Sequence, residues 1–351
     1  MVWRSIAAAL ALLALAGASA RADSVADFYK GKIVNLVVGY GSGGGYDVYG
    51  RLVATHLGKY IPGNPTVVIQ NMPGAGSLRA VNYLYNTAPK DGTVLATFAR
   101  DMPLMGLIGN NANVRFDPRK LTWLGSSSSY GDDAYLLMTR KDAAVKSIAD
   151  ARRAGGPPLV LGGTAEGATG NDISTVLRDA LSLNIKIIVG YPDSNALFLA
   201  ADRKETDGRF VGLSAVSSSH PEWLRAGSNM QVLLQFARLT RHPQFPEVPT
   251  ARELAESDRA RALIELAELP YRLSRPFAAP PGLPAERAKA LQQAFLAVHQ
   301  DPDYLDEAQK LKVDVSPIGG DEVLRAIDGI AGAPPDLLDY IKKLLSESKN
   351  G

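Results

Sequence analysis

The sequence predicts an α/β protein of two lobes, with the second lobe inserted between two halves of the first. A unit of strand, glycine-rich loop and helix recurs along the chain, and such alternation generally gives a parallel sheet with helices on its faces. The composition changes near Trp123 and again near Met230. We therefore expect a first lobe from residues 23–122 plus 236–351 and a second lobe from 123–235.

The first half of the chain carries three strands. Ile33–Tyr40 is an apolar, mostly β-branched run, typical of a strand buried on both faces, and Asp47–Tyr60 has apolar residues at helical spacing. The next unit pairs a strand at Thr66–Gln70 with a helix whose apolar face spans Leu78–Tyr85. The turn PKDG then leads into a third strand, Thr93–Ala99.

The rest of the chain is less regular but uses the same units. LTWLGSSSSYGDDAYLLMTRKD suggests two strands around a polar loop, whereas PPLVLGGTAEGATGNDISTVLRDAL and IKIIVGYPDSNALFLAAD each read as strand, loop and helix. The C-terminal third begins with the strand NMQVLLQFA and a Pro-rich connection, His242–Pro249. Helices are expected around Ala251–Glu268 and Pro284–His299.

The N-terminus, MVWRSIAAALALLALAGASARADS, is typical of a secretory signal peptide. Arg4 precedes an apolar run over residues 6–16, and small residues follow as they do before a cleavage site. We expect residues 1–22 to be removed, by cleavage before Arg21 or Asp23. The run is shorter than the roughly 20 apolar residues of a membrane span, and no cysteine can carry a lipid. The mature protein is therefore expected to be periplasmic, unlipidated and not inserted into a membrane.

Charge and residue usage narrow the classes of partner. Without Arg4 and Arg21, the 38 Lys and Arg become 36 and equal the 36 Asp and Glu, so neither nucleic acid nor an anionic membrane is indicated. The absence of cysteine excludes disulfides, thiolate metal sites and a cysteine nucleophile. No two of the four histidines stand at metal-ligand spacing on one helix face, so we expect no metal and no other cofactor.

The stretch VVGYGSGGGYDVYGRL satisfies a dinucleotide-binding pattern only in its glycines. Gly39, Gly41 and Gly44 follow a strand and open a helix, as that pattern requires. The next strand, however, ends in Gln70 and Asn71, where a carboxylate would hold the ribose. The loop also lacks the Gly-Lys-Ser/Thr ending of a P-loop, and the residues around Ser42 do not form a nucleophile elbow.

Two loops of this kind favour an anion site. The loops at 41–45 and 74–76 expose backbone N–H groups at helix N-termini, where unpaired donors and the helix dipole attract anions. One such loop alone is as well explained by a tight turn. Two loops on consecutive units open at the same carboxyl-end edge of a sheet, which is where α/β sheets bind ligands. We therefore predict a carboxylate site.

The chain resembles the substrate-binding receptors of tripartite tricarboxylate transporters, also called Bug receptors. The resemblance lies in VVGYGSGGGYDVYGRLVATHLGKYI, VVIQNMPGAGSLRAVNYLYNTAPKDGTVL, FPEVPTARELA and FAAPPGLPAERAKALQQAF, and it spans about Phe28 to Leu344. It implies the two-lobed periplasmic-binding-protein (Venus flytrap) fold with two crossing strands as hinge. It also implies a monomer that gives a small organic carboxylate to membrane permease subunits.

The resemblance further implies which residues hold the ligand. In the family, backbone amides of two loops bind one carboxylate between the lobes. The matching positions here are Tyr40, Gly41, Ser42, Gly43, Pro73, Gly74, Ala75, Gly76 and Ser77. The family's usual proline before the first loop is Gly39 here, and its usual glycine after PGAG is Ser77. The second-lobe loops match only loosely, and the expected contacts there are Ser128, Thr164, Thr169 and Tyr191.

Four side chains leave alternatives open. Arg100 either pairs with a second ligand carboxylate or forms a surface ion pair with an acid such as Asp101. Glu166 either meets the far end of the ligand or is solvated, and Tyr191 either lines the site or packs. Asp47 is expected to stabilise the start of its helix and the loop before it, in preference to direct contact with the ligand.

Other functions remain as alternatives to a transport receptor. The same binding fold could serve as a ligand sensor for a signalling partner. A secreted α/β enzyme would need a base beside a nucleophile or a pair of carboxylates in different environments, and the sequence indicates neither. We therefore predict no enzymatic activity.

Overall fold

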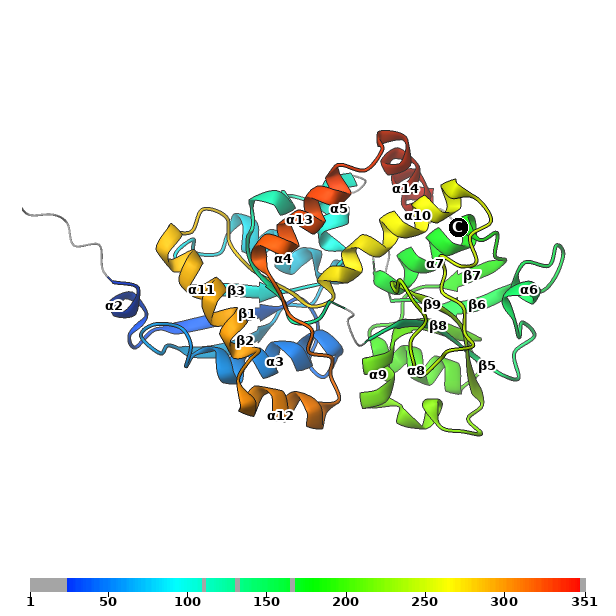
Figure 1. Cartoon of the computed structure of the whole chain (residues 1–351), viewed down its shortest axis with the longest axis horizontal. Helices are drawn as coiled ribbons and strands as arrows, with labels where there is room; N and C mark the ends of the chain where they lie inside the picture. The colour runs from blue at the N-terminus through cyan, green and yellow to red at the C-terminus, as the bar shows by residue number, and fades with distance from the viewer. Residues whose placement is uncertain (1–23, 109–111, 130–132, 165–167, 348–351) are drawn as a thin grey trace, which may run out of the picture.

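The computed structural model describes residues 24–108, 112–129, 133–164 and 168–347, and it has two α/β lobes side by side (Figure 1). Each lobe is built on its own sheet, with the strand orders β11-β4-β10-β3-β1-β2 and β7-β6-β8-β5-β9. The predicted signal peptide lies outside the described residues. The two-lobed periplasmic-binding-protein fold predicted from the sequence is confirmed.

The first sheet is parallel only in part. Its strands are β1 (Ile33–Val38), β2 (Thr66–Asn71), β3 (Val94–Thr97), β4 (Thr122–Ser126), β10 (Pro276–Ala279) and β11 (Ile318–Gly319). β1 pairs with β2 and β3 in parallel, as the repeated units predict. β10 pairs antiparallel with β3 and β4, so the prediction of a parallel sheet is wrong there. The reason is that β10 comes back from the second lobe and not from a preceding strand-to-helix unit.

Seven helices of the described chain surround the first sheet, and they include the two helices predicted after its first two strands. They are α2 (Val25–Tyr29), α3 (Gly45–Leu57), α4 (Leu78–Asn86), α5 (Met102–Ile108), α11 (Ala285–Val298), α12 (Pro302–Leu311) and α13 (Gly320–Ala331). Leu36 of β1 packs into one hydrophobic cluster and Val37 into another, on opposite faces of the sheet. The strand is thus buried on both faces, as its unbroken apolar run predicts.

The second sheet is also mixed. Its strands are β5 (Tyr135–Arg140), β6 (Leu159–Gly162), β7 (Ile185–Ile188), β8 (Gly208–Gly212) and β9 (Met230–Phe236). β6 runs parallel to β7 and β8, whereas β5 runs antiparallel to β8 and β9. Its helices are α6 (Ile148–Ala151), α7 (Thr169–Ala180), α8 (Ser194–Asp202), α9 (Leu213–Ser219), α10 (Asp258–Glu268) and α14 (Pro335–Glu347).

Two of these helices come from late in the chain. Both α10 and α14 pack against α7, and Leu337 and Ile341 of α14 share a buried cluster with Ile173 and Leu177 of α7. Figure 1 shows α14 over the second sheet, beside α7 and α10. The sequence assigns both helices to the first lobe. The residue bounds of the lobes therefore stay a prediction, and α10 and α14 are the elements on which it depends.

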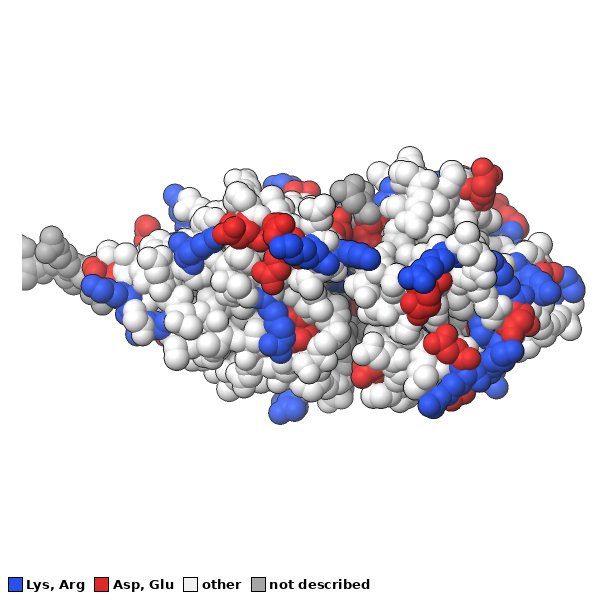
Figure 2. Space-filling view, turned by 90° about the horizontal axis from the view of Figure 1, so that it is seen from below, with Lys and Arg blue, Asp and Glu red and all other residues white. Residues whose placement is uncertain are grey.

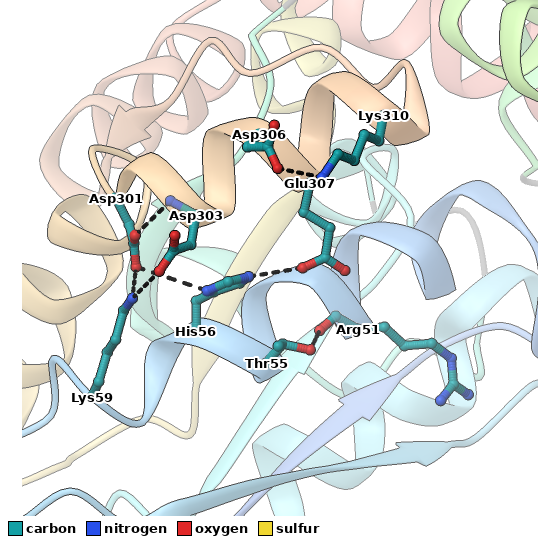
Figure 3. Close-up of polar contacts among 9 residues, drawn as sticks. All are labelled: Arg51, Thr55, His56, Lys59, Asp301, Asp303, Asp306, Glu307 and Lys310. Atoms are coloured by element: carbon teal, nitrogen blue, oxygen red, sulfur yellow. Dashed lines mark hydrogen bonds and ion pairs between the residues drawn. The ribbon is translucent and has the colours of Figure 1, made fainter.

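A cluster of charged side chains fixes α12 on α3 (Figure 3). His56 Nε2 lies 2.9 Å from Glu307 Oε2, and His56 Nδ1 lies 3.8 Å from Asp301 Oδ2. Lys59 pairs with the same Asp301, which also accepts a hydrogen bond from the first turn of α12. These contacts lie at the C-terminal end of α3 and join that helix to the C-terminal part of the first lobe.

Figure 2 shows the molecule from below, with a furrow between its two halves. Lysine and arginine side chains alternate with acidic ones across both halves of this face. The furrow marks where the edges of the two lobes face each other. The loops that follow the parallel strands lie at these edges, which is where α/β sheets bind ligands.

Candidate functional site

The first glycine-rich loop ends in a helix start that its own acid stabilises. Asp47, 1% exposed, accepts a 2.8 Å hydrogen bond from the Gly43 amide and another from Asn71 Nδ2. Arg51 Nε lies 2.8 Å from the same carboxylate. Burial acts to raise the pKa of Asp47, but these hydrogen bonds and the charge of Arg51 hold it below its usual value. Asp47 thus has the structural role that the sequence predicts.

The donors that precede Gly43 are left exposed. Gly41 and Ser42 lie on the surface, and neither amide makes a hydrogen bond to any part of the chain that the structure describes. Gly43 itself has φ +85°, a backbone conformation that residues other than glycine rarely adopt. The loop therefore presents two backbone N–H groups to solvent just before the N-terminus of α3.

The second loop is held in a strained conformation. Four successive residues have positive φ, namely Gly74 (143°), Ala75 (47°), Gly76 (60°) and Ser77 (85°). For Ala75 and Ser77 this conformation costs about 1 kcal/mol or more each. Such strain persists only where the surrounding structure imposes it, and it is concentrated at functional sites. The Ser77 amide closes the turn with a 3.1 Å bond to the Gly74 carbonyl.

The structure brings the two loops together, as the sequence predicts. Val38 and Asn71, the last residues of β1 and β2, are partners in the parallel register. Asn71 Nδ2 donates to the Tyr40 carbonyl at 2.9 Å, and so ties the end of β2 to the first loop. The backbone positions expected from the family resemblance, Tyr40–Gly43 and Pro73–Ser77, therefore lie at neighbouring strand ends.

An aromatic pair and two arginines back the first loop. Tyr40 stacks on Tyr46 with ring centroids 4.9 Å apart, and burial raises the pKa of Tyr40. The Tyr46 hydroxyl accepts hydrogen bonds from Arg100 N and Nε, at 3.1 and 3.4 Å. The Arg275 guanidinium lies 4.9 Å from the centroids of both Tyr46 and Tyr49. Sequence reasoning missed Tyr46 and Arg275, because only long-range packing places Arg275 here.

Arg100 does not form the surface ion pair that was one of its two predicted roles. It is 2% exposed, and its guanidinium lies 5.2 Å from the Tyr135 ring and 4.9 Å from the Tyr271 ring. Its Nη1 also donates to Ser274 Oγ at 3.4 Å. Burial is possible because two aromatic faces and the hydroxyls of Tyr46 and Ser274 replace the water that the guanidinium loses.

The next residue, Asp101, connects the two lobes. The Thr169 hydroxyl, at the first position of α7, donates a hydrogen bond to the Asp101 carboxylate, which is 4% exposed. Burial raises the pKa of Asp101, although Thr169 and Arg100 act to lower it. Thr169, predicted as a ligand contact, therefore lies where the end of β3 meets the second lobe. Asp101 has no motif signal, and sequence reasoning did not assign it to the site.

The other second-lobe residues lie in two places. Thr164 and Tyr191 are at the same edge of the second sheet, joined by the 3.1 Å bond from the Gly190 amide to the Thr164 carbonyl. The Tyr191 hydroxyl donates to Glu205 at 3.4 Å, and burial raises the pKa of Tyr191. Ser128 is buried on the segment that leaves β4, and its carbonyl accepts from the Ser274 amide. The predicted Glu166 lies outside the described residues.

One pair has the composition of a catalytic dyad. Ser127 Oγ lies 2.8 Å from His299 Nε2, and His299 Nδ1 is 2.7 Å from the Phe295 carbonyl. The sequence did not indicate this pair, because 172 positions separate its members. Ser127 is 0% and His299 4% exposed, so no substrate reaches them in this structure. Burial lowers the pKa of His299 to about 4.

Within residues 24–108, 112–129, 133–164 and 168–347, no group of three or more His, Asp or Glu side chains is placed to hold a metal ion. No helix in these ranges is both long enough and apolar enough to cross a membrane.

Comparison with known sequences gives two relatives, whereas no protein-family model matches the chain. The "UPF0065 protein in gbd 5′region" of Cupriavidus necator is 34% identical over 144 residues, 41% of each chain. A UPF0065 protein of Bordetella pertussis is 24% identical over 303 residues, which is 85% of this chain and 84% of the relative. The chain thus spans under half of the first relative and most of the second.

Solved structures with the same fold are periplasmic binding proteins. The periplasmic binding protein BugD covers 90% of this chain, and this chain covers 98% of it, with TM-score 0.67 and 18% identity. MatC of Rhodopseudomonas palustris with bound malate has a TM-score of 0.63 and 18% identity, and the match covers 90% of this chain and 99% of MatC. An R. palustris protein with adipate has a TM-score of 0.65 and 19% identity, and the match covers 90% of this chain and 97% of that protein. The resemblance to Bug receptors predicted from the sequence is confirmed, and these matches establish the fold.

Proposed function

We propose that this protein is a periplasmic receptor that captures a small organic carboxylate between its lobes and delivers it to a tripartite tricarboxylate-type transporter. The exposed, unbonded amides of Gly41 and Ser42 at the start of α3, beside the strained loop 74–77, carry this proposal. Malate and adipate, bound by two structures of the same fold, support a carboxylic acid as the ligand.

The first lobe would hold the carboxylate through its backbone. A helix N-terminus stabilises an anion by about 0.3–1 kcal/mol, or about 2 where partly buried, and each hydrogen bond to a charged group adds about 1.5–3 kcal/mol. A few such contacts, less the cost of immobilising the ligand, give binding of about −8 kcal/mol, which is micromolar. Since Asp47 already takes the Gly43 amide, Gly41, Ser42 and the second loop supply the donors.

The second lobe would then determine which carboxylic acid the protein binds. Closure brings Thr164, Thr169 and Tyr191 against the far end of the ligand, together with Ser128 from the segment that leaves β4. Arg100 and Glu166 are the remaining candidates for this contact. The Asp101–Thr169 hydrogen bond supports closure as the relevant motion, because it joins the lobes beside the first-lobe site.

A binding role without catalysis fits the arrangement of side chains. The Ser127–His299 pair is sealed from solvent, and the low pKa of His299 makes it a weak base. We propose a monomeric, unlipidated periplasmic protein whose signal peptide, residues 1–22, is removed. Mass spectrometry of a periplasmic extract should find a mature chain that begins near Arg21 or Asp23.

The test is thermal unfolding of the mature protein with matched acids and amides. Malate, adipate and a set of other small carboxylic acids are each compared with the corresponding amide. A true ligand at 100 times its Kd adds about 2.7 kcal/mol, which raises Tm by about 5 °C. The acid should raise Tm and its amide should not. An amide that stabilises as well as its acid, or no stabilisation by any acid, would contradict the proposal.

A further inference from the structure

The hydroxyl of Ser77 joins the ends of two strands. Ser77 is fully buried, and its Oγ donates to the Gly39 carbonyl at 3.2 Å, just beyond β1. The same oxygen accepts a 3.1 Å hydrogen bond from the Ala99 amide, beyond the end of β3. Ser77 itself belongs to the loop that follows β2. One side chain therefore connects three consecutive strand-to-helix loops, an arrangement that we call the Ser77 bridge.

This use of the side chain departs from the usual one. Ser77 is the residue before the first turn of α4, where a serine normally caps the helix through its hydroxyl. Here the side chain makes no capping bond, and the backbone has φ +85°. The residue thus gives up a cap and takes a strained conformation while its hydroxyl bonds to Gly39 and Ala99.

Gly39 leaves the space that the bridge occupies. A Cβ atom built on Gly39 would lie 2.5 Å from Ser77 Oγ and 2.7 Å from Ser77 Cβ. Real Cβ atoms essentially never come so close to another atom, so residue 39 cannot carry a side chain while Ser77 keeps its position. Without the Ser77 side chain, the nearest of these contacts would be Ser77 Cα at 3.3 Å. Residues 39 and 77 therefore depend on each other.

We propose that Ser77 is a positioning residue of the carboxylate site, an inference that rests on the proposed function. Its hydroxyl fixes the first loop, which contains the Gly41 and Ser42 donors, relative to the second loop. Through Ala99 it also fixes the chain that continues into Arg100 and Asp101. Because Asp101 bonds to Thr169 of the second lobe, the bridge sets the geometry of the anion donors and of the lobe contact together.

Amide hydrogen exchange of the ligand-free mature protein tests the bridge directly. In Ser77→Ala and Ser77→Gly, peptides covering residues 37–46 and 95–101 should exchange about tenfold faster, because the Gly39 and Ala99 bonds are lost. Residues 135–140 of the second sheet should not change. Ser174→Ala is the matched control, since Ser174 is also buried and its hydroxyl donates to the Gly170 carbonyl within α7, away from the first-lobe loops. It should leave both first-lobe peptides unchanged.

A double-mutant cycle tests the dependence of Gly39 on Ser77. Gly39→Ala alone should lower Tm by about 3–8 °C, because the added Cβ overlaps the bridge. In Gly39→Ala/Ser77→Gly, at least half of that loss should return, because the overlapping atoms are gone. A residue with a purely general role in stability would show additive losses and no rescue.

Two outcomes would overturn the inference. One is unchanged exchange in both peptides of Ser77→Ala and Ser77→Gly. The other is a double variant whose Tm equals the sum of the single losses. Neither measurement requires a ligand, so a protein that binds no carboxylate would refute the proposed function and still report on the bridge. Faster local exchange together with rescue supports the bridge.

Discussion

The start of α3 in the first lobe differs from the starts of α8 and α9 in the second lobe. In the first lobe, the donors of Gly41 and Ser42 before α3 are exposed and make no hydrogen bond within the described chain. In the second lobe, the protein's own carboxylates take the corresponding positions. Asp133 accepts from Ser214 at the start of α9, and Asp193 accepts from Ala196 at the start of α8.

This contrast assigns different tasks to the lobes. A helix start that already holds a carboxylate has satisfied its donors and its dipole, so a ligand anion gains little there. At the start of α7 the contact is made by a side chain, because the Thr169 hydroxyl donates to Asp101 of the first lobe. We infer that the first lobe binds the anionic group by its backbone, and that the second lobe selects by its side chains.

The largest expected effect is on the second lobe, in Asp133→Ala. The carboxylate of Asp133 accepts bonds from the amide and hydroxyl of Ser214 and from the Ala134 amide, and it is 2% exposed. Leaving these buried donors unpaired should lower the free energy of unfolding by about 4 kcal/mol, measured by urea denaturation. The control is Asp193→Ala, where an exposed cap should cost only about 1 kcal/mol. Equal losses would show that the two helix starts are equivalent.

The next effect is on binding, in Gly43→Val. At φ +85° a valine is strained and should shift the loop that carries the Gly41 and Ser42 donors, so affinity for the carboxylate should fall about 100-fold, or about 2.7 kcal/mol. The matched control is Gly31→Val, with φ +70° and open space around it, outside the site. Calorimetry with the acid found by thermal unfolding should show a loss only for Gly43→Val. A similar loss in both variants would indicate general strain.

The smallest expected effect is on the pH dependence of stability, which should have opposite signs for a buried group in each lobe. In the first lobe, burial lowers the pKa of His299 from 6.5 to about 4. The unfolded chain therefore binds a proton first as the pH falls, and this group alone lowers the free energy of unfolding by about 2 kcal/mol between pH 7 and 5. The free energy of unfolding of His299→Gln, measured relative to the parent by denaturation, should therefore rise by about 2 kcal/mol from pH 7 to pH 5. If the difference between variant and parent were the same at both pH values, His299 would not be the group responsible.

Glu268, which packs with the second lobe on α10, should act in the opposite direction. Burial raises its pKa from 4.5 to about 7, despite Arg252 and the Ala237 amide. Its contribution to stability is thus present at low pH and lost as the pH rises through about 7. Glu268→Gln should remove that loss. The parent protein should therefore change little between pH 5 and 7, because the two groups oppose each other.

The sequence by itself determined the local units and the convergence of the two glycine-rich loops. The unbroken apolar run of β1 specifies a strand buried on both faces, and the glycines at 41–44 and 74–76 specify tight turns into helices. Since parallel strands place such turns at one edge, the convergence of the two loops could be predicted, whereas a carboxylate as the ligand stays a prediction. These conclusions depend on contacts between residues close in the chain, or on a repeated unit.

Only the tertiary structure decided the remaining features of the site. The antiparallel return of β10, the packing of α14 on α7 and the burial of Arg100 between Tyr135 and Tyr271 join residues far apart in the chain. Arg275 beside Tyr46 and Asp101 against Thr169 are of the same kind. No local pattern encodes such pairs, because arginine, aspartate and tyrosine are also common on surfaces, and only their burial against one another distinguishes them.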